Sequence, residues 1–243
     1  MVRVLREYST NPLWNVLVEV VHSLPLYNAH KAYFIEKVMP ERPFISYEEL
    51  AALLGVTFGE AMVILYESRM TREEVEWELA RRERPRPRFR RAAMGGTFNE
   101  IHYGHVALLL TAFTSGEHVV IGVTSDELVS KLGKQHPVKS YGERVEGLKQ
   151  FLQEHGLEER STIAKLEDPY GPPAYDGEIE ALVASPFTAG RVEEINRIRV
   201  EKGLEPVKLV TCPIVLAEDG KPISSTRIAA GEITPDGRVV KKL

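Results

Sequence analysis

Hydrophobic residues recur at helical spacing through the first third of the chain. This pattern predicts helices at residues 13–24, 29–38, 49–54, 59–68 and 71–82. Ser46 and Glu49 stand three residues apart, as in a capping box that begins a helix, and Gly55 suits a helix end. Residues 46–68 therefore have the outline of a helix-turn-helix.

Beyond residue 90, short apolar runs alternate with amphipathic segments. Strands are predicted at residues 91–94, 118–123, 161–166, 181–184 and 207–212, and helices at 103–113, 141–155 and 191–201. Strands that alternate with helices form a parallel sheet with right-handed crossovers. We therefore expect a Rossmann-like α/β domain with any nucleotide site at the carboxyl ends of its strands.

An Arg- and Pro-rich stretch separates the two patterns. Residues 81–91 read RRERPRPRFRR, and a helix is excluded because proline lacks an N–H and disfavours helical geometry in the preceding residue. We expect a linker here, with a small helical domain and the linker at residues 1–87 and the α/β domain at residues 88–243.

Composition narrows the class of protein further. The chain is 43% apolar and 27% charged, with a net charge of −4, which argues against a general nucleic-acid binder. Cys212 is its only cysteine, so neither an internal disulfide nor a cysteine zinc site can form. No apolar run is long enough for a membrane span and no secretory signal is visible, so the expected location is the cytoplasm.

The first motif with chemical content is MGGTFNEIHYGH, at residues 94–105. A strand ends in Gly95 and Gly96, where the backbone can turn tightly beside a ligand, and a helix begins near residue 103 with free N–H groups suited to a phosphate. His102 and His105 are three residues apart, so both imidazoles can face one phosphate, and Gly104 leaves room for a nucleotide.

The second motif is PISSTRIAAGEI, at residues 222–233. Ser224, Ser225 and Thr226 precede a short helix, and Arg227 is a permanently charged donor of several hydrogen bonds. Hydroxyls, N–H groups and a guanidinium at a helix start again suit an anion.

The two motifs resemble those of the nucleotidyltransferase superfamily, which has a Gly-x-Phe turn followed by His-x-Gly-His. Gly96, Thr97, Phe98, His102, Gly104 and His105 stand at these positions. Asn99 replaces a common Asp and keeps a hydrogen-bonding side chain, so no change of function is expected from it. Residues 90–237 most resemble phosphopantetheine adenylyltransferases of the archaeal and eukaryotic type, which carry ISSTRI near the C-terminus.

This resemblance implies adenylyl transfer from ATP to 4'-phosphopantetheine, with Mg²⁺ arriving on ATP and no metal held by the protein. His105 would stabilise charge on the α-phosphate, His102 would hold the triphosphate, and Thr97 would bridge ATP and acceptor. The ATP-binding residues would be Gly96, Thr97, Phe98, His102, Gly104, His105, Ser224, Ser225, Thr226 and Arg227.

The acceptor phosphate would be bound by Thr97, Lys134 and Arg144, with Lys131 and Lys139 as competing lysines. Arg144 could instead pair with a surface glutamate, and Asp168 before Pro-Tyr-Gly is expected to form a turn.

Two other functions compete with this interpretation. The acceptor could be nicotinamide mononucleotide or FMN, although the nicotinamide enzymes usually have Pro where Glu100 stands. Alternatively, the helix-turn-helix could belong to a nucleotide-sensing DNA-binding regulator. Residues 1–80 are net acidic and residues 59–69 carry one basic residue, so a unit for packing or homo-oligomerisation is favoured.

Overall fold

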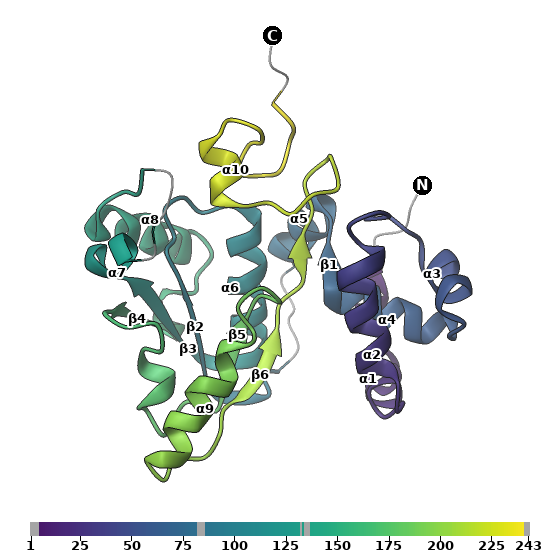
Figure 1. Cartoon of the computed structure of the whole chain (residues 1–243), viewed down its shortest axis with the longest axis horizontal. Coiled ribbons are helices and arrows are strands. Elements are labelled where there is room, and N and C mark those ends of the chain that lie inside the picture. Colours follow the sequence, from purple (N-terminus) through teal and green to yellow (C-terminus); the bar gives the residue numbers. More distant parts are fainter. Residues whose placement is uncertain (1–4, 82–85, 132, 134–136, 241–243) are drawn as a thin grey trace.

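The computed structural model describes residues 5–81, 86–131, 133 and 137–240. A helical N-terminal part lies beside a part built on a central sheet (Figure 1). The helical part consists of η1 (Leu5–Thr10), α1 (Trp14–His22), α2 (Tyr27–Tyr33), the π-helical η2 (Phe34–Val38), α3 (Tyr47–Leu54) and α4 (Phe58–Ser68). The predicted helices are therefore present, each with slightly different ends.

Helices α3 and α4 form the predicted helix-turn-helix. Ser46 and Glu49 make the capping box, and Gly55 ends α3 in the left-handed conformation, with φ of 68°. The axes of α3 and α4 differ by 113°. Along α4 only Phe58 is exposed, whereas a DNA-reading helix must offer a face to the groove. This burial supports a packing role for the pair.

No single helix among the described residues is both long and apolar enough to cross a membrane. The bent pair α3 and α4 reaches that length and apolar character only when the two helices are taken together.

The main sheet has five parallel strands in the order β4-β3-β2-β5-β6. The strands are β2 (Phe89–Gly96), β3 (Gly116–Thr124), β4 (Ser161–Leu166), β5 (Ala181–Ala184) and β6 (Lys208–Thr211). The first strand of this sheet along the chain, β2, lies in its middle. Strands β3 and β4 follow on one side of β2, and β5 and β6 follow on the other. Strand order thus reverses at β2, as in Rossmann-like folds.

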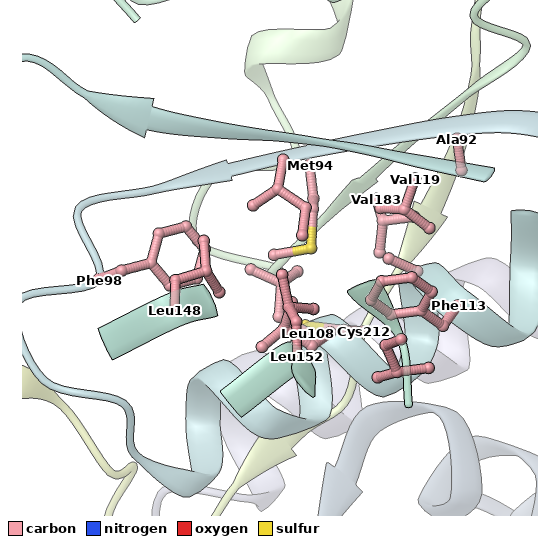
Figure 2. Close-up of a cluster of buried hydrophobic side chains, with 14 of the residues drawn as sticks. Ala92, Met94, Phe98, Leu108, Phe113, Val119, Leu148, Leu152, Val183 and Cys212 are labelled. Atoms are coloured by element: carbon pink, nitrogen blue, oxygen red, sulfur yellow. The ribbon is translucent and has the colours of Figure 1, made fainter. Parts of the chain in front are cut away.

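Helices cover both faces of this sheet. The remaining elements are α5 (Arg72–Ala80), α6 (Tyr103–Ser115), α7 (Asp126–Lys131), α8 (Tyr141–Glu154), η3 (Glu158–Arg160), η4 (Pro172–Ala174), α9 (Arg191–Glu201) and α10 (Ser225–Ala229). Successive β2 residues point to opposite faces: Met94 packs with Leu108 and Leu152 from α6 and α8 (Figure 2), and Ala93 packs with Ile195 from α9.

Strand β2 begins earlier than the sequence predicts. Phe89, Arg90 and Arg91 belong to it, although they end the Arg-rich stretch that we expected to be a linker. Carboxylates offset their charge, because Arg91 lies 2.8 Å from Glu178 and Arg90 lies 3.6 Å from Glu180. Residues 82–85 of that stretch lie outside the described residues.

A second, two-stranded sheet joins the helical part to the main sheet. In it β1 (Arg69–Met70) pairs in parallel with β7 (Ile214–Val215), and neither strand was predicted. Two apolar cores extend across this junction. Ile214 and Leu216 pack into the core of the helical part, whereas Met70 and Val75 share a core with Val106 of α6.

Candidate active site

The turn after β2 is shaped by Phe98. This residue has φ of 53°, a conformation that few residues other than glycine adopt, and its ring is buried in the core beneath the turn beside Leu148 (Figure 2). A Cβ atom on Gly96 would lie 2.9 Å from the Phe98 ring. Gly96 is thus required because the ring folds back over it, and the turn exposes the backbone around Thr97.

His102 connects the two sequence motifs. It is the N-cap of α6, where its Nδ1 accepts a hydrogen bond of 3.3 Å from the N–H of His105. Its proton is therefore on Nε2, which lies 3.2 Å from Oγ of Ser225 in the second motif. Burial lowers the pKa of His102 from 6.5 to about 4, so the imidazole is neutral at pH 7.

His105 stacks on His102, with ring centroids 3.9 Å apart. Its Nδ1 donates to the carbonyl oxygen of Glu100 at 3.1 Å. A contact between His105 and a phosphate would therefore be made by Nε2.

Gly104 is constrained by its neighbour His102. A Cβ atom at this position would lie 3.0 Å from Cε1 and 3.1 Å from Nδ1 of His102. A larger residue here would crowd the His102 ring, and the room for a nucleotide beside Gly104 stays a prediction.

Asn99 links the loop before α8 to the turn that follows β2. Its side-chain oxygen accepts from the N–H of Lys139 at 2.7 Å, and its amide nitrogen donates to the carbonyl of Pro137 at 3.3 Å. A carboxylate could accept the first bond but could not donate the second. Asn99 therefore makes one bond that the family's common Asp could not make, whereas the expectation of unchanged function stays a prediction.

Arg144 braces the same turn from below. Its side chain is fully buried and donates to the carbonyls of Thr97 and Lys139, both at 2.9 Å, and to Asp126 at 2.8 Å. Among the described residues its ion-pair partner is Asp126, not a glutamate. Bonds from the Tyr141 N–H and from Arg144 hold the pKa of Asp126 below its ordinary value. The predicted contact with an acceptor stays a prediction, whereas the geometry favours a positioning role.

The second motif begins α10, with Ser224 as its N-cap. The Arg227 side chain, predicted to bind phosphates, is bonded to protein groups in this structure. Its nitrogens lie 2.5 Å from Asp219 and 3.0 Å from Glu232, and Nη1 donates to the carbonyl of Pro222 at 3.1 Å. All three guanidinium nitrogens therefore have protein partners.

A cleft of about 320 Å³ opens at the carboxyl ends of β2, β3 and β5. Thr97 lies on its wall, and most other wall residues are apolar or glycine. Arg191 at the start of α9 is the one charged side chain among the described residues that line the cleft, and the sequence analysis did not single it out. The cleft suits an extended, largely apolar ligand that enters beside Thr97.

The three candidate lysines are placed unequally. Lys131 ends α7 and Lys134 lies outside the described residues, whereas the backbone of Lys139 is bonded to both Asn99 and Arg144. Asp168 forms a turn, as predicted, because its carboxylate accepts from the N–H groups of Tyr170 and Gly171 at 2.8 and 2.7 Å.

Comparison with known proteins agrees with this arrangement. The cytidylyltransferase-like family model matches residues 93–231, which contain the first motif and all but the last two residues of the second. A phosphopantetheine adenylyltransferase of Methanopyrus kandleri is 43% identical over 149 residues, which are 61% of this chain and 94% of that protein. The phosphopantetheine adenylyltransferase of Methanosarcina barkeri is 44% identical over 156 residues, 63% of this chain and 94% of that protein. The chain belongs to the cytidylyltransferase-like family and, within it, to the phosphopantetheine adenylyltransferases.

Proposed function

We propose that this protein transfers the adenylyl group of ATP to 4'-phosphopantetheine, giving dephospho-coenzyme A and pyrophosphate. The observation that carries the proposal is the contact of His102 with Ser225, 123 positions apart in the chain, which brings the two phosphate-binding motifs together. The names of the relatives support the choice of acceptor over nicotinamide mononucleotide and FMN.

The reaction is a direct in-line displacement. A phosphate oxygen of the acceptor attacks the α-phosphorus of ATP, the bond to the bridging oxygen breaks, and pyrophosphate leaves. The attacking phosphate is already ionised at neutral pH, so no general base is needed. Catalysis comes from positioning and from donors aimed at the developing charge.

The donors have distinct roles in this scheme. His105 stabilises the α-phosphate through Nε2, and neutral His102 donates through its Nε2–H, which now lies against Ser225. Thr97 lies on the wall of the cleft and bridges ATP and acceptor. Ser224, Ser225 and Thr226 receive the β- and γ-phosphates through hydroxyl and N–H groups.

Mg²⁺ enters this scheme as part of the substrate Mg-ATP. Among the described residues, no group of three or more His, Cys, Asp or Glu side chains could hold a metal ion. In this proposal the phosphates of ATP supply the anionic ligands that Mg²⁺ requires.

Pyrophosphate release from Mg-ATP tests the proposal. The acceptors are 4'-phosphopantetheine, nicotinamide mononucleotide, FMN and glycerol 3-phosphate, with His105→Ala as the control. We expect turnover with 4'-phosphopantetheine alone, and its loss in the control. Turnover only with another acceptor would refute the acceptor assignment and keep the chemistry.

The same assay identifies the acceptor-phosphate lysine. Lys131→Ala, Lys134→Ala and Lys139→Ala are compared by the acceptor concentration that gives half-maximal rate, which should rise most in the variant that lacks the binding lysine. The sequence favours Lys134, and the bonded backbone of Lys139 beside Thr97 makes it the first alternative.

A further inference from the structure

Arg227 is a structural clamp between three segments of the chain. Its side chain is 16% exposed and joins α10 to Asp219 before the motif and to Glu232 near the motif's end. It also bonds the carbonyl of Pro222, two residues before Ser224. The orientation of the first turn of α10, which carries Ser225, therefore depends on where Asp219 is held.

Asp219 lies in a tight turn on which the helical part of the protein rests. The N–H of Ala217 donates to the carbonyl of Lys221 at 2.8 Å, and Gly220 has φ of 75°. A Cβ atom on Gly220 would lie 3.1 Å from Cβ of Pro43 and 3.3 Å from Cε2 of Phe44. The segment between η2 and α3 thus packs directly on this turn.

The packing segment is itself anchored to the junction sheet. The guanidinium of Arg69 in β1 donates to the carbonyl oxygens of Pro43 and Ile45, the latter at 2.7 Å. Strand β1 pairs with β7, which leads straight into the turn. Successive contacts therefore connect the helical part to Arg227 through the turn that contains Asp219.

We propose that the helical part positions the triphosphate-binding motif, with Asp219 as the positioning residue that transmits its contact to Arg227. This positioning role rests on the proposed function, in which ATP is the substrate. Phe44 and Pro43 hold the turn, Asp219 holds Arg227, and Arg227 holds the start of α10 beside His102. The relatives cover 61–63% of this chain, so more than a third of it lies outside those matches.

The experiment measures Mg-ATP affinity by calorimetry without acceptor, using the full-length chain. We compare Asp219→Ala, Asp219→Asn and Phe44→Ala with the matched control Phe58→Ala, another exposed phenylalanine of the helical part, whose ring lies beside that of Tyr47. We expect Asp219→Ala and Phe44→Ala to raise the Kd about three- to tenfold, since bonds to a charged group are lost or loosened. Asp219→Asn, which keeps an acceptor, should be intermediate, and Phe58→Ala should be unchanged.

Kinetics and a double variant sharpen the test. The KM for ATP should rise while that for the acceptor stays constant, and the effects of Phe44→Ala and Asp219→Ala should not add if one turn transmits both. Unchanged ATP affinity in a folded Phe44→Ala protein would overturn the proposal. Tighter binding in Asp219→Ala would also overturn it, because Asp219 would then restrain Arg227 from the phosphates. Weaker ATP binding without turnover of any acceptor would support the coupling and refute the proposed function.

Discussion

Asn99 lies in the turn after β2, where its amide both donates and accepts a hydrogen bond, which a carboxylate could not do. Replacing Asn99 by Asp keeps the bond from the Lys139 N–H but places a carboxylate against the carbonyl of Pro137. The loop that carries Lys139 should loosen, so we expect Asn99→Asp to lower kcat/KM for the acceptor roughly three- to tenfold. Steady-state kinetics at saturating ATP measures this change.

Asn196 provides the matched control for that prediction. Its side-chain oxygen accepts from the N–H of Val207 at 2.8 Å, and its amide nitrogen donates to the carbonyl of Val207 at 3.1 Å. Asn196 belongs to α9 and not to the turn after β2. Asn196→Asp should therefore lower stability without changing kcat/KM. Equal kinetic effects of the two substitutions would mean that Asn99 acts only through stability.

The burial of His102 predicts a pH dependence of stability. Its pKa is 6.5 when unperturbed and about 4 in the fold, so between these values the unfolded chain binds a proton that the folded protein excludes. The free energy of unfolding should thus fall as pH decreases from 6.5 to 4, by up to about 3 kcal/mol from this group. Above pH 6.5 its contribution is fully present.

Urea unfolding from pH 4.5 to 7.5 checks this prediction against His102→Asn. Asparagine is a good N-cap and cannot titrate, so the variant should lose less stability over the acidic part of the range. Parallel curves for the two proteins would show that His102 does not titrate as proposed.

For single residues, the sequence predicted contacts between near neighbours but not the partners of the two arginines in the site. The capping box at Ser46 and the turn at Asp168 were predicted correctly because their partners lie within a few residues. The sequence does not show whether Arg144 and Arg227 bind phosphates or oxygen atoms of the protein itself. Their partners, such as Thr97 and Asp219, are chosen by the fold.

At the scale of elements, length decided which predictions succeeded. The strands β4 and β5 were predicted with their observed bounds, β5 because its residues ALVA form a short apolar run. Strands β1 and β7 have two residues each, too few for any periodicity to appear. The junction that they form was therefore invisible before the structure.

Arg69 should be the main stabilising residue of that junction. Arg69→Ala leaves the carbonyls of Pro43 and Ile45 without their donor, and we expect a loss of about 2–3 kcal/mol in the free energy of unfolding. Arg42→Ala is the control, because its pair with Glu49 is half exposed and should contribute at most about 1 kcal/mol. Equal losses in urea titrations would contradict this role of Arg69.

For the whole molecule, the predicted boundary at residue 87 meets a continuous core. Met70 and Val75 precede that boundary, yet they pack with Val106 and Val215 of the α/β part. A chain of residues 88–243 would expose this apolar surface. It should therefore be less stable than the full protein by on the order of 5 kcal/mol, because burial of each such side chain contributes about 1.5–3 kcal/mol.

A chain of residues 69–243 separates the two halves of this argument. It retains β1, α5 and the shared core but lacks the helices that cover Ile214 and Leu216. Its urea midpoint, followed by circular dichroism, should lie between those of residues 88–243 and the full chain. If residues 88–243 unfold at the same midpoint as the full protein, the shared core contributes nothing, and the helical part is an appendage whose removal the α/β part tolerates.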